Sequence, residues 1–535
     1  MDLILYNGVI KTMVDHQTVS ALAIENGLIV QVGNDEEILQ LKKNGTQVID
    51  LQGKPALPGF NDAHIHLLGY GVNKRRLNLA GSRSIAELVQ RGKDYLAKYP
   101  TTEVLIGRGW NQDVFTARKS PTRADLDQIS TELPIVFIRV CGHNLVINSR
   151  ALQFYDIDEK TTAPPGGSID FEAGTFYENA MDLIALPQPK GKEIKEILLE
   201  VMEDLAEKGI TSVHSDDFGI GDYQQVISAY QELAAQGKMK VRVYQQCLFS
   251  DIDEVSGFLR TTGDWNSDSA YYRLGPIKLL ADGSLGARTA YMSRPYHDDS
   301  ATRGIACYTA EELEAIVLLC HQQRRAVAVH CIGDGMLQRL LDSVDNAQRC
   351  YPQITDVRHG VVHCQISTPA QLKKIAKLGM VAYVQPIFLD YDLHIVKDRV
   401  GESLANSSYA FKSLIDYGVV SALSTDCPVE PFDPFNNLYC AVSRKDLNGY
   451  PPDGFNPAQA LSIHQAVKGY TVNGGYCSYE EQVKGRLLPG YYGDIVVLNR
   501  DIYRCEPKEV KNATVEMTIV GGKISYFRLK GLINP

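Results

Sequence analysis

Residues 58–67 read Pro58-Gly59-Phe60-Asn61-Asp62-Ala63-His64-Ile65-His66-Leu67, so an apolar run ends in a His-x-His pair. On a β-strand, side chains two residues apart lie on the same face. On a strand, His64 and His66 would point the same way and could share one cation, since imidazole suits zinc and similar metals. The alternative is two hydrogen-bonded histidines at a strand end, and the rest of the chain must decide between the two.

Length and composition place the chain among globular proteins. Its 535 residues exceed one ordinary domain and can hold a barrel of about 250 residues plus a further unit. Hydrophobic residues make up 44% and charged residues 22%, as in folded domains. The formal net charge of -10 argues against a nucleic-acid partner, because phosphate binding needs clustered Lys and Arg. We therefore expect a small-molecule substrate.

Membrane and secretion signals are missing from the sequence. No apolar run reaches the roughly 18 residues that a membrane span needs. The segment Met1 to Gly8 lacks the basic region and apolar core of a signal peptide. The 11 cysteines are scattered, without a Cys-x-x-Cys pair, and we expect reduced thiols. These observations predict a cytoplasmic protein without a membrane partner.

Both ends of the chain show short apolar runs separated by turn signals. Residues 2–33 contain Asn7-Gly8 and Asn26-Gly27, which are hairpin signals, and predict a small antiparallel sheet. Near the other end, Gly521-Gly522 separates two strand-like runs. We predict that residues 1–55 and 486–535 form one composite β-sandwich domain, since chain termini often lie close together.

Between the ends, strand-like and helix-like stretches alternate, which favours a parallel sheet. Thr309 and Glu312 form a capping box ahead of one predicted helix, and Thr368 and Pro369 open another. The strand candidates are Ala56 to His64, Gly209 to His214, Val241 to Gln245, Pro276 to Ala281, Ala326 to His330, Gly360 to His363, Met380 to Gln385 and Val420 to Thr425. Eight strands favour an α/β fold with a closed (β/α)8 TIM-like barrel over residues 56–485.

One gap between the predicted strands is too long for a single crossover. Roughly 140 residues separate His66 from Gly209, and unstructured loops of that length are uncommon. We therefore predict that residues 70–185 form an inserted subdomain over the mouth of the barrel.

Residues able to bind metals stand at the ends of the predicted strands. In a parallel barrel the active site lies at the C-terminal ends of the strands. Burying charged or imidazole side chains there is costly unless they are paired or metal-bound. The candidates are His64, His66, Lys278, His330, His363 and Asp426. His359 is a second candidate on strand six, but His363 closes the apolar run and is preferred.

Several motifs resemble the amidohydrolase superfamily, and the resemblance covers nearly the whole chain. Pro58 to His66 looks like its strand-one signature, and Lys484 to Leu498 like the return into its β-domain. Gly109-Trp110-Asn111-Gln112, residues 142–152 and residues 278–290 resemble the family-3 branch, which includes N-substituted formamide deformylase-like proteins. These motifs are specific for the family and much less so for a substrate.

The resemblance implies hydrolysis of an amide-type C-N bond, such as that of an N-acyl or N-formyl amine, by metal-activated water. It also implies divalent metal, with zinc expected first, at one or two ions per chain. His64, His66 and Asp426 would hold the more buried ion, His330 and His363 the second. Lys278 would bridge the two ions after reacting with CO2, because an ammonium cannot ligate a cation and a carbamate can. The alternatives for Lys278 are an ion pair with Asp282 or an unmodified lysine at a one-metal site.

Further residues receive roles by the same resemblance, each with a structural alternative. Asp426 would also move the proton from water to the leaving amine; otherwise it caps a helix. His143 would hydrogen-bond the substrate carbonyl; otherwise it is a structural histidine. Trp110 would form a pocket wall or pack in a core. Asp282 and Arg288 would orient the carbamate or bind a substrate carboxylate.

His214, at the end of predicted strand two, would support the ligands or simply pack.

Two other functions compete with amide hydrolysis. Deaminases of heterocyclic bases in this superfamily carry a glutamate just after the strand-five histidine, where this chain has Cys331-Ile332-Gly333-Asp334. A catalytically silent scaffold protein would be expected to have lost ligands, and here all are present. From the family we expect a homodimer.

Overall fold

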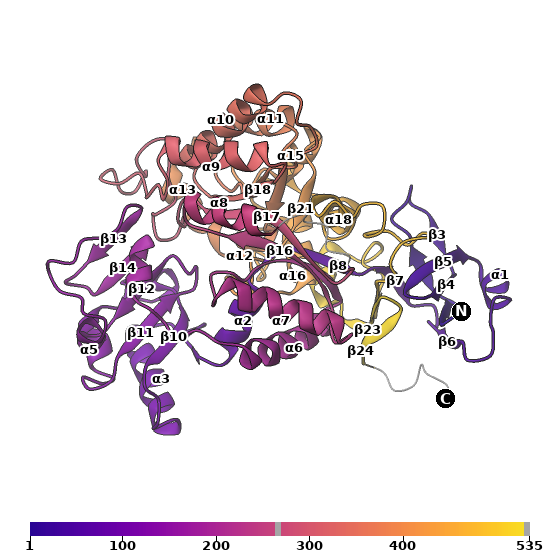
Figure 1. Ribbon diagram of the computed structural model, residues 1–535, viewed down its shortest axis with the longest axis horizontal. Coiled ribbons are helices and arrows are strands. Elements are labelled where there is room, and N and C mark those ends of the chain that lie inside the picture. The colour runs from indigo at the N-terminus through magenta and orange to yellow at the C-terminus, as the bar shows by residue number, and fades with distance from the viewer. Residues whose placement is uncertain (263–268, 529–535) are drawn as a thin grey trace.

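The computed structural model describes residues 1–262 and 269–528. At its centre an eight-stranded parallel sheet curves into a barrel, with an inserted sheet on one side and strands from both chain ends on the other (Figure 1). The barrel strands follow chain order: β8 (Phe60–Ile65), β15 (Ile210–Asp216), β16 (Arg242–Leu248), β17 (Tyr272–Leu280), β18 (Val327–Cys331), β19 (Gly360–His363), β20 (Val381–Val384) and β21 (Ser421–Leu423). Each barrel strand overlaps one of the eight predicted strands, so the predicted number and order are confirmed.

The first and last barrel strands are joined by contacts just beyond the ladder. The backbone N–H of Asp426 donates to the carbonyl oxygen of His64 at 2.9 Å. The buried carboxylate of Asp62 accepts from the backbone N–H of Thr425 at 3.0 Å and from its hydroxyl at 2.6 Å. These bonds hold the C-terminal ends of β8 and β21 side by side.

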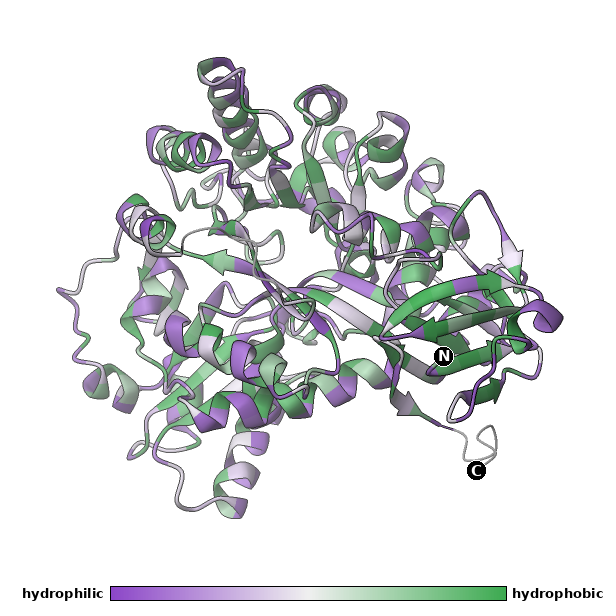
Figure 2. Cartoon of the chain, turned by 45° about the vertical axis from the view of Figure 1, so that its right-hand side comes forward, coloured by the Kyte–Doolittle hydropathy of each residue, from purple (hydrophilic) through white to green (hydrophobic). Residues whose placement is uncertain are grey.

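Helices alternate with the strands and cover the outside of the barrel. They are α6 (Lys192–Glu207), α7 (Tyr223–Ala235), α8 (Ile252–Thr261), α9 (Ala310–Gln322), α10 (Asp334–Cys350), α11 (Pro369–Lys377), α15 (Phe411–Asp416), α16 (Pro434–Ser443), α17 (Ile463–Gly469) and α18 (Val472–Cys477). The predicted capping box of Thr309 and Glu312 is present at α9. Apolar and polar residues alternate along these helices (Figure 2), as expected when one face packs on the barrel. Among the residues that the structure describes, no helix is long and apolar enough to span a bilayer.

The run predicted as one strand from Ala56 to His64 is two strands. β7 (Pro55–Pro58) pairs antiparallel with β22 (Ile495–Leu498), whereas β8 pairs parallel with β15. Gly59 separates them, and a Cβ there would lie 2.1 Å from a side-chain atom of Thr211. Only glycine fits this approach, which lets the chain pass from one sheet into the next.

Strands from both ends of the chain form two further sheets. The four-stranded sheet has the order β5 (Leu28–Gly33), β4 (Ala21–Glu25), β1 (Leu3–Tyr6) and β6 (Gln47–Asp50). The six-stranded sheet has the order β24 (Lys523–Phe527), β23 (Val515–Val520), β22, β7, β2 (Val9–Lys11) and β3 (Thr18–Val19). Leu22 and Ile24 of the first sheet share an apolar cluster with Ile495 and Ile519 of the second. Strands from the two chain ends therefore pair directly.

The turn signals in these sheets have mixed outcomes. Asn26-Gly27 joins the antiparallel strands β4 and β5, with φ of 53° and 78°, and Gly521-Gly522 joins β23 and β24. Asn7-Gly8 was predicted to form a hairpin, and this was wrong. It connects β1 to β2, which lie in different sheets, because β1 pairs with β4 and β6 instead.

The long gap after β8 folds into a sheet of its own, with strand order β13 (Gly167–Asp170), β14 (Thr175–Glu178), β12 (Asn144–Ile147), β11 (Ile135–Arg139), β10 (Leu105–Trp110) and β9 (Leu77–Asn78). The helices α3 (Ile85–Lys98), α4 (Arg123–Asp127) and α5 (Ser149–Phe154) belong to the same stretch. The turn between β11 and β12 carries His143, and this turn reaches the barrel strand ends (ring centroids of His143 and His330 4.8 Å apart).

Candidate metal centre

Two of the predicted ligands, His64 and His66, converge on one oxygen atom of a third, Asp426. Oδ1 of Asp426 lies 3.2 Å from Nε2 of His64 and 3.1 Å from Nε2 of His66. The possible ligand atoms of the three residues all lie within 4.8 Å of one another. His64 is on β8, His66 follows it directly and Asp426 follows β21, so the barrel closure brings them together. Burial acts to raise the pKa of the Asp426 carboxyl, but a proton on Nε2 of His64 or His66, donated to Oδ1, would lower it well below its ordinary value.

The opposite nitrogen of each histidine is anchored to an oxygen that can only accept. Nδ1 of His64 lies 2.6 Å from Oε1 of Gln246, and Nδ1 of His66 lies 3.1 Å from the backbone oxygen of Asp216. Each Nδ1 therefore carries the proton, which leaves Nε2 as a lone pair directed at Asp426. A lone pair and a carboxylate at such distances require a cation or an added proton between them.

His330 and His363 show the same arrangement on strands five and six. Nε2 of His330 donates to the backbone oxygen of Gly283 at 3.1 Å, and Nδ1 of His363 donates to Oε1 of Gln385 at 2.9 Å. The other two ring nitrogens, both unprotonated, then face each other at 3.0 Å. Burial lowers the pKa of His363 to about 3 and lowers that of His330 well below its ordinary value, so both rings are neutral. Two opposed lone pairs repel, and a cation bound by both removes the repulsion.

Lys278 contributes a buried amine to the same region. It lies on β17, is fully buried, and its Nζ has no hydrogen-bond partner among the described residues. Burial lowers the pKa of the amine, which favours the uncharged form that reacts with CO2. The ring centroids of His64 and His363 are 5.8 Å apart, so the two ligand groups are neighbours. Six predicted ligands thus meet at the C-terminal ends of the strands, and their donor set fits a divalent metal.

His143 approaches from the inserted sheet. Its Nδ1 donates to Oε2 of Glu178 at 2.7 Å, and Glu178 is itself buried at the end of β14. Burial acts to lower the pKa of His143, but the Glu178 carboxylate raises it to about 9. Nε2 is left as a donor beside His330.

Other predicted site residues lie elsewhere or have other partners. Trp110 is buried in the apolar core of the inserted sheet and donates to the backbone oxygen of Phe137 at 3.0 Å, so it does not line the site. Asp282 is fully buried, accepts from the backbone N–H of Ile332 and Gly333 at 3.0 and 2.8 Å, and lies 3.5 Å from Nε2 of His330. Its carboxylate anchors the chain segment after β18.

Arg288 is committed to an ion pair. Its guanidinium binds both oxygens of Asp298 at 3.1 and 2.8 Å, beside a polar cavity of about 570 Å³ that Arg399 also lines.

His214 is buried inside the barrel against Tyr244, with burial lowering its pKa to about 3. It is therefore neutral and belongs to the packing rather than to the ligand cluster.

Sequence reasoning missed Asp216, Gln246, Gln385 and Glu178. The predicted strands two and three stopped at His214 and Gln245, whereas β15 and β16 continue to Asp216 and Leu248. Searching the true strand ends would have found Asp216 and Gln246. Nothing in the sequence marks Glu178, which is brought in by the inserted sheet.

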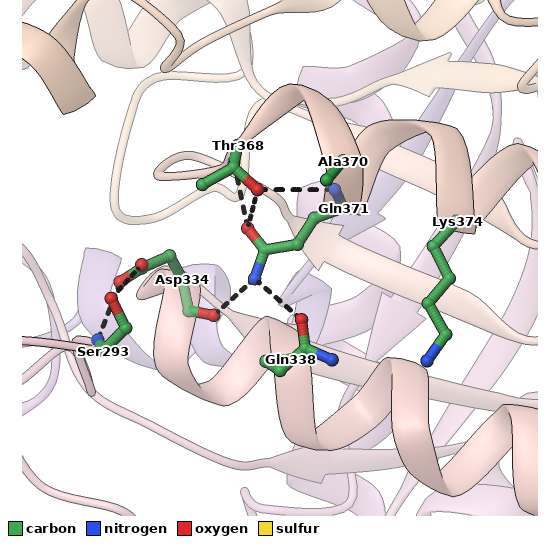
Figure 3. A pocket seen from close by; sticks show the side chains of 7 residues that line it. All are labelled: Ser293, Asp334, Gln338, Thr368, Ala370, Gln371 and Lys374. Carbon is green, nitrogen blue, oxygen red and sulfur yellow. Dashed lines mark hydrogen bonds between the residues drawn. The ribbon is translucent and has the colours of Figure 1, made fainter.

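A smaller cavity of about 320 Å³ lies away from these ligands, between the first turns of α10 and α11 (Figure 3). Its polar side chains already have partners: Gln371 donates to the backbone oxygen of Asp334 at 2.8 Å, Ser293 donates to the Asp334 carboxylate, and Lys374 pairs with Asp342. Thr368 caps α11 in the same place. These are helix-start contacts and do not form a catalytic site.

Comparisons with known proteins agree with this geometry. The amidohydrolase family matches residues 47–526 of the chain. YtcJ of Bacillus subtilis (strain 168), by its name a candidate amidohydrolase, is 30% identical over 98% of this chain and 99% of its own length. The N-substituted formamide deformylase of Arthrobacter pascens is 24% identical over 98% of both chains.

A solved structure shows the same fold over nearly the whole molecule. It is an uncharacterized metal-dependent hydrolase of Pyrococcus horikoshii OT3, 28% identical, with a TM-score of 0.77 over 94% of this chain and 99% of that chain. The family match and the full-length relatives lead to one conclusion: the chain belongs to the amidohydrolase family, in the branch that resembles formamide deformylases.

Proposed function

We propose that the protein is a metal-dependent hydrolase of an amide-type C-N bond, with N-formyl or N-acyl amines as its substrate class. The observation that carries the proposal is the arrangement of four histidines: Nε2 of His64 and His66 meet Oδ1 of Asp426, and the unprotonated nitrogens of His330 and His363 face each other. The deformylase activity in the name of the Arthrobacter pascens relative supports the choice of bond.

In this proposal His64, His66 and Asp426 hold one divalent ion and His330 and His363 a second. Zinc suits this set of imidazole and carboxylate ligands. Lys278, if converted to a carbamate by CO2, would supply anionic oxygen ligands to these ions. When bound, such ions acidify water and polarise a carbonyl group.

The protein's own groups move the protons. Both histidine contacts of Asp426 use Oδ1, which leaves Oδ2 to take a proton from the attacking water. The water oxygen bonds to the carbonyl carbon, the C-N bond breaks, and Asp426 passes the proton to the leaving amine nitrogen. His143, held as a cation by Glu178, donates a hydrogen bond to the carbonyl oxygen as negative charge develops there.

A deaminase would need an acid just after His330. The carboxyl group in that segment is that of Asp334, the first residue of α10. It accepts hydrogen bonds from the backbone N–H and the hydroxyl of Ser293, so it has a structural role. The homodimer, the cytoplasmic location and the domain boundaries given above stay predictions.

The test combines metal content and substrate turnover. We expect about two metal ions per chain in the wild type and one or fewer in Lys278→Ala, measured by mass spectrometry of purified protein. Lys195→Ala, on the exposed face of α6, is the matched control and should keep the wild-type content.

Amine release from a panel of N-formyl and N-acyl amines should then fall at least ~10²-fold in Asp426→Asn, because the proton carrier is lost. One metal ion in both wild type and Lys278→Ala would reject the carbamate bridge. Wild type that binds metal yet releases no amine from the panel would reject the substrate class.

A further inference from the structure

Asp216 is a buried carboxylate that the proposed mechanism does not use. It is the last residue of β15 and only 2% exposed. Neither of its carboxylate oxygens has a hydrogen-bond partner among the described residues. An ionised carboxylate without donors is costly to bury, so the fold must offset its charge with a positive group nearby.

The nitrogen groups that Asp216 faces belong to the proposed metal centre. Its Oδ2 lies 3.9 Å from Nδ1 of His66, the nitrogen that donates to its own backbone oxygen at 3.1 Å. Its charge also reaches Lys278, where it opposes the lowering of the amine pKa that burial causes. Asp216 pairs in register with Gln246, which holds His64, so the ends of β15 and β16 orient both histidines of the His-x-His pair.

Asp216 is placed behind the ligands and not among them. The three residues whose ligand atoms lie within 4.8 Å of one another are His64, His66 and Asp426, and Asp216 is outside this group. Its carboxylate is nearest to the histidine nitrogen that points away from the proposed ion. Carboxylates behind a ligating histidine fix the ring orientation and make the ligand more basic.

We propose that Asp216 is a positioning residue of the metal centre, which orients His66 and supplies the negative charge that retains a divalent cation there. The inference rests on the proposed function, because it needs an ion at His64, His66 and Asp426. It also explains why the Asp216 carboxylate is buried at the barrel mouth without a hydrogen-bond donor. Its burial destabilises the metal-free protein, and a bound cation would offset this effect.

The experiment measures zinc affinity of the full-length protein by competition with a chelator, together with the urea midpoint of the metal-free form. We expect Asp216→Asn to bind Zn²⁺ about 10- to 100-fold more weakly, as for other carboxylates behind metal-bound histidines. Its metal-free form should unfold at the same or higher urea concentration than the wild type, because an unpaired buried charge has been removed. If the Asp216 carboxylate had only a structural role, Asp216→Asn would lower the urea midpoint of the metal-free form and leave the zinc affinity unchanged.

The neighbouring residue provides a matched control. Asp217 is equally buried, but it accepts from the backbone N–H of Leu68 at 2.8 Å and from the hydroxyl of Tyr230 at 2.6 Å, on the helix side of the strand. Asp217→Asn should lower the urea midpoint and leave the zinc affinity within about threefold of wild type. In a His66→Ala background, Asp216→Asn should have a much smaller effect, since the residue through which it acts is gone.

The outcomes separate this inference from the proposed function. Wild type that fails to bind Zn²⁺ would reject the metal centre itself. Wild type that binds Zn²⁺ with an affinity unchanged in Asp216→Asn would reject only the role of Asp216. A metal-free Asp216→Asn that is less stable or does not fold, with Asp216→Glu no better at holding zinc than Asp216→Asn, would show a structural role instead.

Discussion

Glu178 controls the charge of His143, a predicted site residue that the inserted sheet brings to the barrel mouth. The two side chains share a hydrogen bond of 2.7 Å, and the pKa of His143 is raised from its ordinary value near 6.5 to about 9. A group with a raised folded-state pKa contributes stability that is full below 6.5 and is lost as the pH rises through about 9.

Replacing Glu178 by Gln should therefore remove this pH dependence. In the metal-free wild type, the unfolding free energy should fall by ~3 kcal/mol between pH 6 and pH 10 through this pair. Glu178→Gln should lack that part of the slope, because burial alone then keeps His143 neutral. Urea unfolding at several pH values measures the difference. Glu509→Gln, which removes an exposed ion pair with Arg500, is the control. Equal pH dependence of the unfolding free energy in wild type and Glu178→Gln would contradict the role of Glu178 in charging His143.

At the residue scale, the sequence predicts ligands better than it predicts their supports. His64, His330, His363 and Asp426 could be found because each ends an apolar run, and barrel geometry gathers strand ends in one place. Trp110 shows the limit, because a large aromatic side chain packs equally well in a core or in a pocket wall. Only the arrangement of the inserted sheet shows that it lies in a core.

Among the elements, α9 shows how a local signal fixes a boundary. The hydroxyl of Thr309 accepts from the backbone N–H of Glu312 at 3.2 Å, and the Glu312 carboxylate accepts from the backbone N–H of Thr309 at 2.8 Å. The sequence alone located this helix start, since a capping box involves residues only three positions apart.

Loss of this cap should be measurable in the whole protein. Thr309→Ala should lower the unfolding free energy by ~1 kcal/mol, because one N–H at the helix start loses its acceptor. Thr309→Ser, which keeps the hydroxyl, should recover most of the loss. Chemical denaturation of both variants measures the effect. Equal stabilities for Thr309→Ala and wild type would mean that the cap does not contribute.

Strand boundaries were predicted less well than helix starts, for a physical reason. β7 and β8 form one apolar run in the sequence, and only the close contact of Gly59 with Thr211 divides them between two sheets. That contact joins positions about 150 residues apart, which no local pattern encodes. The short predictions for β15 and β16 have a similar origin, because polar residues at a barrel mouth continue a strand that would end elsewhere.

For the whole molecule, one buried ion pair ties the barrel to the sheets formed by the chain ends. Arg242 of β16 binds both oxygens of Asp494 at 2.7 and 3.0 Å, and its guanidinium lies 3.7 Å from the ring centroid of Tyr492. Arg242 and Asp494 are 3% and 6% exposed, so each charge depends on the other. The inserted sheet and this pairing of distant ends could be predicted only in outline, because both depend on contacts between remote segments.

Replacing Asp494 by Asn should destabilise the protein by about 3 kcal/mol, because the buried guanidinium keeps its charge and loses its partner. The urea midpoint should fall accordingly. Glu196→Gln breaks the exposed pair with Lys192 on α6 and should change the unfolding free energy by less than about 0.5 kcal/mol. Similar effects of the two substitutions would show that the pair does not hold the barrel to the end sheets.

The barrel closure also sets an order of events during synthesis. His66 and Asp426 share a contact although 360 positions separate them in the chain. During most of translation, a growing polypeptide therefore contains His64 and His66 before their carboxylate partner Asp426 has been synthesised. Capture of an ion by all three residues can happen only after the eighth strand has left the ribosome, so metal uptake would report that the barrel is complete.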